Sequence, residues 1–320
     1  MTGVRLRVGT RGSQLALRQT GLVIDAIRRV APGISLETTI ITTAGDRAVD
    51  VPLERLDGVG FFAKELEAAL VDGRCDLAVH SAKDLPTSLH PGLTLGAVPR
   101  RTEPRDVLIS RGGERLGELP PGARVGTSSP RRAAQLRAQR PDLRPVPIRG
   151  NLDTRLAKLG RGECEALCVA GAGLVRMGWQ DRITEWLAPA VMLPAPAQGA
   201  LAVEIRGADV ELAQLLRPLD DAATREAVAA ERAFLARLES GCRAPAAALA
   251  DVGPGGLVLE ALVAREDGTA VRRHRSRGPL GSAAWLGTAA ADYLLAHAGG
   301  VLASVPDAPR ALPVGGPGAP

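Results

Sequence analysis

Seven arginines and no lysine lie between Gly126 and Arg155. Arginine presents a rigid, planar fork of donors that grips a carboxylate or a phosphate through two hydrogen bonds, which lysine cannot do. The arginines of this stretch are Arg131, Arg132, Arg137, Arg140, Arg144, Arg149 and Arg155. Their type and density predict an anion-binding surface, although a solvated basic helix followed by a loop would have the same composition.

The residues before Arg131 favour the anion site. Ser129 is a candidate helix N-cap and Pro130 a candidate first helical residue, so Arg131 and Arg132 would lie in the first helical turn. Cations there oppose the helix dipole unless an anion is bound, and a helix N-terminus is itself an anion site. The same turn supplies three hydroxyl groups, those of Thr127, Ser128 and Ser129.

The same layout recurs in the sequence. From Ile148 to Arg155 the chain again reads as a strand, a glycine turn, a polar cap and an arginine. Near the N-terminus, Ser13 is a candidate N-cap with Arg11 just before it. Two such turns within residues 124–155 predict a small polyanionic ligand.

Two further residues are chemical candidates. Asp84 follows a buried strand and lies beside Lys83. Many such aspartates cap a turn, but the carboxyl end of an α/β strand is also where ligands bind, and both interpretations stand. Cys242, in a Gly-Cys-Arg-Ala-Pro loop, is either an ordinary buried thiol or a nucleophile whose thiolate is favoured by Arg243.

Alternating strands and helices must position these residues. Strands are predicted at residues 4–9, 36–42, 77–79, 93–98, 107–110, 201–205, 257–264 and 271–276, and near Val125, Val146, Leu167 and Val191. Helices are predicted at 14–30, 62–71, 210–216, 224–238 and 283–297, and near Ala133 and Leu156. The Pro-bounded segments 99–104 and 194–199 predict two crossings between domains, which would make the first domain discontinuous.

Composition excludes several classes of protein. The 320 residues suit two or three domains, and the net charge is only +5. Three Phe, three Trp and one Tyr are too few for nucleic-acid binding by base stacking. The N-terminus lacks the apolar region of a signal peptide, and no apolar run is long enough to span a membrane. The four cysteines are scattered in an apparently cytosolic chain, where disulfides are not expected, and they lack the ligand spacing of a zinc site.

Several long motifs together resemble the porphobilinogen deaminase (hydroxymethylbilane synthase) family. The resemblance covers about residues 4–245, in order and without large gaps. The motifs are VGTRGSQLAL, GVGFFAKELE, AVHSAKDLPT, EPRDVLIS, GTSSPRRAAQL, IRGNLDTRL, LPAPAQGALAVE and AERAFLARLESGC.

The resemblance implies an α/β fold of two periplasmic-binding-protein-like domains with mixed sheets, followed by a small α+β domain. The first domain would comprise residues 1–99 and 200–219 and hold Asp84 and part of the anion cleft. The second, arginine-rich domain would comprise residues 105–193. The third, residues 222–302, would carry the attachment cysteine, and residues 303–320 are expected to form a disordered tail.

The resemblance also implies a chemistry. Four molecules of porphobilinogen, which carries an acetate and a propionate, would be joined head to tail with loss of ammonia on a covalent dipyrromethane cofactor, giving hydroxymethylbilane for haem biosynthesis. The thioether attachment falls on Cys242 and the catalytic aspartate on Asp84. The implied cofactor ligands are Ser81, Lys83, Asp84, Thr127, Ser128, Ser129, Arg131, Arg132 and Arg155. The implied substrate ligands are Arg11, Ser13, Gln19, Arg149, Arg155 and Arg176, and a mobile lid would include Gly58, Gly60 and Phe62.

The expected protein is a cytoplasmic monomer that binds no metal, nucleic acid or membrane. The resemblance implies that uroporphyrinogen-III synthase takes over the product. The main alternative is a two-domain anion-binding protein without catalysis. Such a protein would need neither Cys242 nor its loop, and it would be expected to carry a signal peptide.

Overall fold

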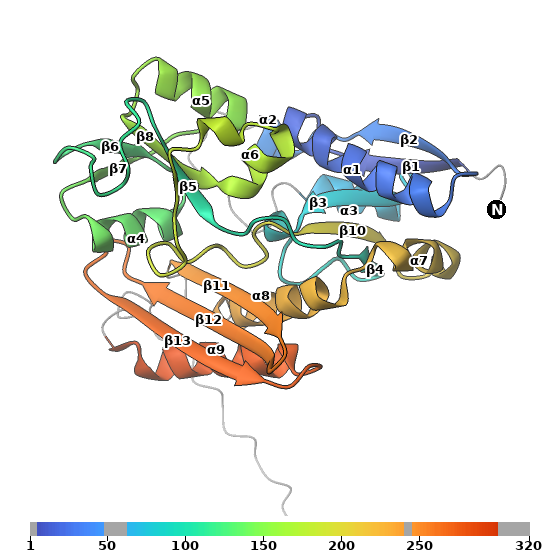
Figure 1. Cartoon of the computed structure of the whole chain (residues 1–320). Helices are drawn as coiled ribbons and strands as arrows, with labels where there is room; N and C mark the ends of the chain where they lie inside the picture. Colours follow the sequence, from blue (N-terminus) through green and yellow to red (C-terminus); the bar gives the residue numbers. More distant parts are fainter. Residues whose placement is uncertain (1–4, 48–62, 240–244, 300–320) are drawn as a thin grey trace, which may run out of the picture.

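The structure is a computed structural model that describes residues 5–47, 63–239 and 245–299. Within these ranges the chain forms three sheets, here called A, B and C (Figure 1). Sheets A and B lie side by side, and sheet C lies against both of them. The helices of the described ranges include none that is long and apolar enough to cross a membrane.

Sheet A has the strand order β2-β1-β3-β10-β4. Its strands are β1 (Arg5–Thr10), β2 (Ser35–Ile40), β3 (Leu77–Ser81), β4 (Leu93–Ala97) and β10 (Leu201–Arg206). Strands β1, β2 and β3 are parallel, whereas β10 is antiparallel to both of its neighbours. The chain thus returns to sheet A after residue 200 and places β10 between β3 and β4.

Amphipathic helices cover the faces of sheet A. They are α1 (Gln14–Val30), α3 (Lys64–Val71) and α7 (Val210–Leu216), and the short helices α2 (Ala44–Arg47), η2 (Ala82–Asp84) and η4 (Arg217–Leu219) lie in the connections. Helix α1 begins as predicted, because Ser13 Oγ accepts a hydrogen bond from Ala16 N at 3.2 Å. Val23, Ile24 and Ile27 of α1 are buried against the sheet.

Sheet B has the strand order β7-β6-β8-β5-β9. Its strands are β5 (Asp106–Ser110), β6 (Arg124–Gly126), β7 (Arg144–Val146), β8 (Ala166–Ala170) and β9 (Glu185–Trp186). Its helices are α4 (Pro130–Gln139), α5 (Leu152–Gly160), α6 (Gly171–Met177) and the short η3 (Gln180–Arg182). Helix α4 starts at Pro130 with Ser129 as its N-cap, as predicted.

The strand predicted near Val191 is wrong. Residues there form a turn in which Val191 N donates to Ala188 O. Pro189 lies within the turn and Pro194 follows it, and proline cannot donate to a strand ladder. The fifth strand of sheet B is instead β9, which pairs with β5.

Two crossings join sheets A and B, and they touch each other. Thr102 N, in the first crossing, donates to Gly199 O, in the second, at 3.1 Å. Gly199 has φ +88°, and a Cβ there would lie 2.6 Å from Thr102 O, so the contact requires glycine. The crossings therefore form a paired connection between the two sheets.

Sheet C contains β11 (Ala246–Gly253), β12 (Gly256–Ala264) and β13 (Val271–Gly278), all antiparallel. Strand β11 is absent from the predicted elements. Helices α8 (Ala222–Glu239) and α9 (Ala283–His297) pack on one face around the buried Phe234. The other face packs on sheet B through Ala134 of α4 and Leu193.

Candidate active site between the sheets

Two adjoining cavities lie between sheets A and B, where β3 and β8 end. Their volumes are about 240 Å³ and about 100 Å³, and they share Arg11, Gln19, Ser81 and Asp84. The other polar side chains that line them are Ser13, Gln14, Lys83, Arg132, Asn151, Asp153, Arg155, Arg176 and Gln198. Most predicted ligands are thus brought to one cleft by segments far apart in the sequence.

A larger groove, of about 460 Å³, lies at the opposite end of sheet A. Its charged residues Asp76 and Arg206 pair with one another, and Arg206 also pairs with Asp209. These side chains already satisfy each other's charge. Their pairing leaves the cleft between the sheets as the place for chemistry, although it is the smaller space.

Asp84 stands at the end of a buried strand. Strand β3 is buried up to His80, and η2 then turns the chain so that half-buried Asp84 faces the cleft. The turn is tied to the second crossing, because Ala82 N donates to Ala200 O at 3.1 Å. This is the position at which ligands bind in α/β sheets.

Two arginines, the half-buried Arg155 and the buried Arg176, interact electrostatically with this carboxylate. Burial lowers the pKa of Arg155 to about 10, repulsion from Arg132 adds to the effect, and Asp84 acts against it. Burial also lowers the pKa of Arg176 to about 10, again against Asp84. Arg155 Nε donates to Gly150 O and Arg176 Nη2 to Gly199 O, both backbone carbonyls rather than carboxylates. Asp84 is therefore a shared counter-charge for several cations.

Lys83 adds a further cation. Its side chain as a whole is exposed, whereas its ammonium group is enclosed by protein atoms. The ammonium nitrogen lies in a buried environment, because Nζ is 3.4 Å from Oε1 of Gln198, a residue only 1% exposed. Burial lowers the pKa of Lys83 to about 8, while Asp84 partly opposes the shift.

Asp106 and Gln198 complete the site, and sequence reasoning did not single them out. Asp106 is fully buried, with Oδ2 2.7 Å from Arg131 Nη1 and Oδ1 2.8 Å from Arg132 Nη2. Burial alone would raise the pKa of Asp106, but Arg131 and Arg132 outweigh it and hold that pKa well below its usual range. Gln198 Nε2 donates to Asp106 Oδ1 at 2.9 Å, and its Oε1 faces Lys83.

A signal for these two residues was present in the sequence. Asp106 is an acidic residue at the start of an apolar strand, and Gln198 follows the prolines of the second crossing. Asp106 and Gln198 contact each other and the arginines only because three segments that are distant in the sequence meet in the fold.

Other predicted ligands serve the backbone in this structure. Ser128 Oγ donates to Ile148 O at 2.8 Å and accepts from Ile148 N, joining the two predicted anion turns. Ser129 caps α4, and Thr127 Oγ1 accepts from Ser129 N. Arg131 also donates to Leu193 O. None of these four residues, nor Arg149, lines the two cavities, so their roles as ligands stay predictions.

Four predicted site residues lie outside the described residues. They are Cys242 and the lid residues Gly58, Gly60 and Phe62. Cys75, Cys164 and Cys168 are free and buried. Within the described ranges, His, Cys, Asp and Glu form no group of three that could hold a metal ion.

Comparison with known proteins decides the family. A profile described as "Porphobilinogen deaminase, dipyromethane cofactor binding domain" matches residues 6–214. Another, described as "Porphobilinogen deaminase, C-terminal domain", matches residues 225–296. The chain belongs to the porphobilinogen deaminase family.

Relatives of this family match over nearly their whole length. The porphobilinogen deaminase of Roseiflexus castenholzii is 50% identical over 295 residues, covering 92% of this chain and 97% of the relative. That of Desulforudis audaxviator is 52% identical over 299 residues, covering 93% and 97%. A solved periplasmic solute binding protein from Desulfovibrio salexigens is similar with a TM-score of 0.42 and 10% identity, covering 68% of this chain and 72% of that one.

Membership of the porphobilinogen deaminase family confirms the predicted activity. The chain is a transferase of tetrapyrrole and haem biosynthesis, a hydroxymethylbilane synthase that uses porphobilinogen and a dipyrromethane cofactor. The alternative of an anion-binding protein without catalysis is not supported. The predicted α/β fold with two mixed sheets and a small C-terminal unit is confirmed as well.

The cleft fits a porphobilinogen deaminase cofactor, which carries several carboxylates. Five cationic side chains, those of Arg11, Lys83, Arg132, Arg155 and Arg176, line the two cavities with only two carboxylates, those of Asp84 and Asp153. Nε of the buried Arg176 also has no hydrogen-bond partner among the described residues. An excess of cations with an unsatisfied buried donor is what a bound polycarboxylate would complete.

Proposed function

We propose that Asp84 is the catalytic carboxylate and Cys242 the cofactor attachment site of this hydroxymethylbilane synthase. The observation that carries the assignment is the single carboxylate of Asp84 at the end of β3, facing Lys83, Arg155 and Arg176. A negative charge held among cations in a restricted cleft can stabilise positive charge that develops on a substrate.

Each charged group has a distinct role in this proposal. Arg155, Arg176 and Arg11 bind the acetate and propionate groups, and Arg132 with Lys83 binds those nearest the second crossing. Asp84 accepts hydrogen bonds from pyrrole N–H groups and stabilises the positive charge that forms when the aminomethyl nitrogen leaves as ammonia. When bound, the dipyrromethane supplies the primer to which pyrrole units are added.

Gln19 and Ser81 hold the floor of the cleft. Gln19 Nε2 donates to Ser81 Oγ at 3.0 Å, which joins α1 to the end of β3 beside Asp84. Ser13 lines the smaller cavity although its hydroxyl also caps α1. We assign Gln19 and Ser13 to substrate binding and Ser81 to cofactor binding on this placement.

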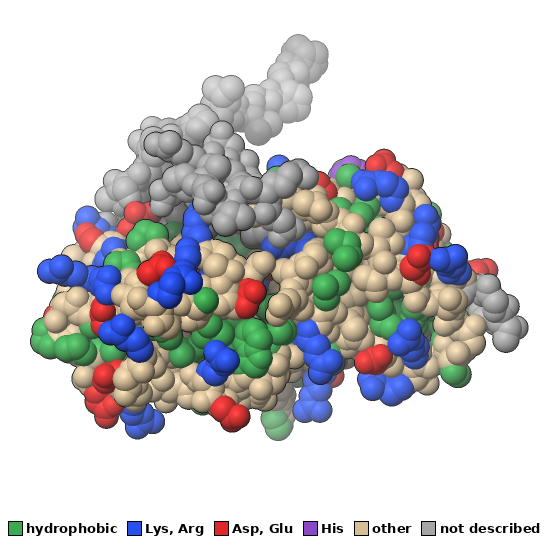
Figure 2. Space-filling model, turned by 90° about the horizontal axis from the view of Figure 1, so that it is seen from above, with side chains coloured by type: hydrophobic (Ala, Val, Ile, Leu, Met, Phe, Trp, Pro, Cys, Tyr) green, Lys and Arg blue, Asp and Glu red, His purple; other side chains and the backbone are tan. Residues whose placement is uncertain are grey.

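The predicted domain limits follow the sheets. Residues 1–99 with 200–219 contain sheet A, residues 105–193 contain sheet B, and residues 222–302 contain sheet C. We propose these as the three structural units. Figure 2 shows basic side chains interspersed with acidic ones over one face of the molecule, which supports a small-molecule enzyme rather than a nucleic-acid binder. The cytoplasmic location, the monomeric state, the hand-over to uroporphyrinogen-III synthase, the lid and the disordered tail also stay predictions.

The assignment of Cys242 is tested by intact mass. Cys242→Ser should fold, should be inactive, and should be lighter than the wild type by two linked pyrrole units beyond the sulfur-to-oxygen change. The variant should also give no colour with an acidic aldehyde reagent. A wild-type protein that has its bare sequence mass while making hydroxymethylbilane, or an adduct on another cysteine, would overturn the assignment.

A further inference from the structure

Helix α8 contacts the segment that follows Asp84 at two points. Arg232 Nη2 donates to Pro86 O at 2.6 Å and to Thr87 O at 3.1 Å. Thr87 Oγ1 donates to Glu239 Oε2 at 2.5 Å. Pro86 and Thr87 are therefore bonded to α8, both through the backbone and, at Thr87, also through the side chain.

The contacts lie along one stripe of the helix. Val228, Arg232 and Glu239 are spaced by four and seven residues, which places them on one side of an α-helix. Val228 packs in the same buried cluster as Ala82 and Leu85, on either side of Asp84. The stripe thus follows the Asp84 segment for about 16 Å, at 1.5 Å per residue.

Arg232 donates its hydrogen bonds to backbone carbonyls. It is half-buried and lies in the field of the Glu204 and Glu239 charges, but its hydrogen bonds go to the two backbone carbonyls. A guanidinium that bonds two successive carbonyls fixes their orientation, because its donors form a rigid fork. The arrangement orders a loop and does not merely neutralise a charge.

Helix α8 is itself anchored to both crossings and to sheet C. Glu231, next to Arg232, is fully buried and pairs with Arg101 of the first crossing at 2.7 Å. It also accepts from Ala197 N of the second crossing and from Ala250 N of β11. A helix held at several points is a rigid support for the segment bonded to its other residues.

We propose that Arg232 and Glu239 are positioning residues that hold Asp84 at a set distance from the end of α8. Glu239 is the last residue of α8 and precedes Cys242 by three residues in the sequence. The helix therefore links the carboxylate to the point of cofactor attachment. This inference rests on the proposed roles of Asp84 and Cys242.

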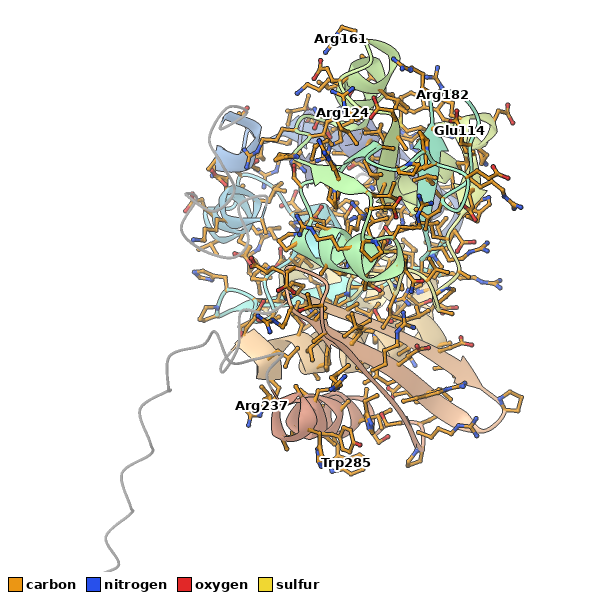
Figure 3. The ribbon with its side chains drawn as sticks, turned by 90° about the vertical axis from the view of Figure 1, so that its left-hand side faces the viewer. Glu114, Arg124, Arg161, Arg182, Arg237 and Trp285 are labelled. Atoms are coloured by element: carbon orange, nitrogen blue, oxygen red, sulfur yellow. The ribbon has the colours of Figure 1, made fainter. Side chains whose placement is uncertain are left out.

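The test compares Arg232→Met with Arg237→Met. Both substitutions remove a guanidinium from α8, but Arg237 pairs with Asp292 of α9 instead of the Asp84 segment. Figure 3 shows Arg237 beside α9, on the C-terminal part of the molecule. Both proteins are measured as holoenzymes. Cofactor loading is determined by intact mass, and amide hydrogen exchange is measured by mass spectrometry.

Arg232→Met should speed hydrogen exchange in a peptide covering residues 85–90 and lower kcat about tenfold or more, because small misplacements of a catalytic group are costly. KM should change less than twofold, since the carboxylate-binding cations remain. Arg232→Lys should restore part of kcat, and Arg237→Met should match the wild type in both readouts. Thr87→Val, which removes only the bond to Glu239, should show the same pattern more weakly.

Unchanged exchange at 85–90, or a kcat equal to that of Arg237→Met, would overturn the inference. A fall in kcat that only follows lost cofactor or a lower Tm, without rescue by Arg232→Lys, would also overturn it by indicating a purely structural role. These failures are distinct from failure of the proposed function, which would appear as activity in Asp84→Asn.

Discussion

Sheets A and B have the same spatial strand order but place different charged side chains at their strand ends. Across each sheet, three parallel strands lie next to an antiparallel strand, and an edge strand lies beyond it. By position, β1, β2, β3, β10 and β4 of sheet A correspond in turn to β6, β7, β8, β5 and β9 of sheet B. Sheet A contributes Asp84 together with Arg11 and Lys83 to the larger cavity, whereas sheet B contributes Arg132, Arg155 and Arg176. In this cavity sheet A therefore supplies the carboxylate and sheet B most of the cations.

The correspondence extends to individual residues. The tetrapeptide Arg-Val-Gly-Thr occurs in β1 and again in β6 with the following residue. Arg7 Nη2 lies 2.8 Å from Asp76 Oδ1, and Arg124 Nη2 lies 2.6 Å from Glu165 Oε1. In both pairs the acidic residue directly follows a buried cysteine and accepts a bond from the arginine's own backbone N–H. These features hold the sheets and are independent of the cleft.

The two halves diverge where the strands end. Ser81 of β3 pairs with Leu201 of β10, and Ala170 of β8 pairs with Asp106 of β5. The same position thus holds a buried leucine in sheet A and a buried aspartate in sheet B. The two sheets therefore share their arrangement of strands and ion pairs, and the residues that serve function differ at the strand ends.

The largest expected effect is on stability, at Asp106. Asp106→Asn should lower the free energy of unfolding by about 3–5 kcal/mol, because removing one partner leaves Arg131 and Arg132 buried without their counter-charge. Urea unfolding monitored by circular dichroism measures it. Because the pKa of Asp106 is lowered, its contribution is present above about pH 4 and is lost as the pH falls, so the variant should show less acid dependence.

A triple substitution provides the control. Asp106→Leu with Arg131→Met and Arg132→Met gives sheet B the apolar character of sheet A at this position. Its stability should be near that of the wild type, since replacing a whole buried ion cluster is often neutral, while cofactor loading should fall. Equal losses of stability in both variants would show that the site does not depend on charge pairing.

The next effect concerns catalysis at Asp84. Asp84→Asn should keep the fold and the cofactor but lower kcat by about a hundredfold to a thousandfold, the usual loss for one electrostatic stabiliser. Asp153→Asn is the matched control, because Asp153 lines the adjoining cavity from sheet B. It should change kcat less than about threefold. Steady-state kinetics with porphobilinogen decide it, and similar rates for both variants would remove the contrast between the sheets.

The sequence alone predicted the helices and strands better than it predicted the contacts within the site. The motifs placed Asp84 at a strand end and Pro130 at the start of α4, because strand period, capping and proline chemistry are local. The Asp106 cluster was missed because residues 106, 131, 132 and 198 meet only in the folded chain. Whether Ser128 would serve a ligand or the backbone is likewise decided by the position of Ile148, which follows β7 and exchanges two hydrogen bonds with Ser128.

A smaller effect should appear in the pH dependence of Lys83. Its pKa is lowered from 10.5 to about 8, so the cation is present below about pH 8 and is lost above it. For the wild type, kcat/KM should fall about tenfold between pH 7 and pH 9 as this carboxylate-binding charge is lost. Lys83→Arg keeps the charge and should shift the fall upward by a unit or more. Parallel profiles of the two proteins would show that another group sets the alkaline limit.

The smallest expected effects are those of the two corresponding ion pairs far from the cleft. Asp76→Asn should lower the free energy of unfolding by about 1 kcal/mol and Glu165→Gln by less, because partly exposed pairs are weak. The Asp76 side chain is 16% exposed and also contacts Arg206, whereas the Glu165 side chain is 30% exposed. The pKa of Glu165 is lowered to about 2, mainly by Arg124, so its contribution is lost as the pH falls below about 4. Both variants should keep wild-type kcat in the cofactor-loaded enzyme, since neither residue lines the cleft. A larger loss of stability for Glu165→Gln than for Asp76→Asn, or a change in kcat for either variant, would mean that the shared framework and the residues at the strand ends do not act independently.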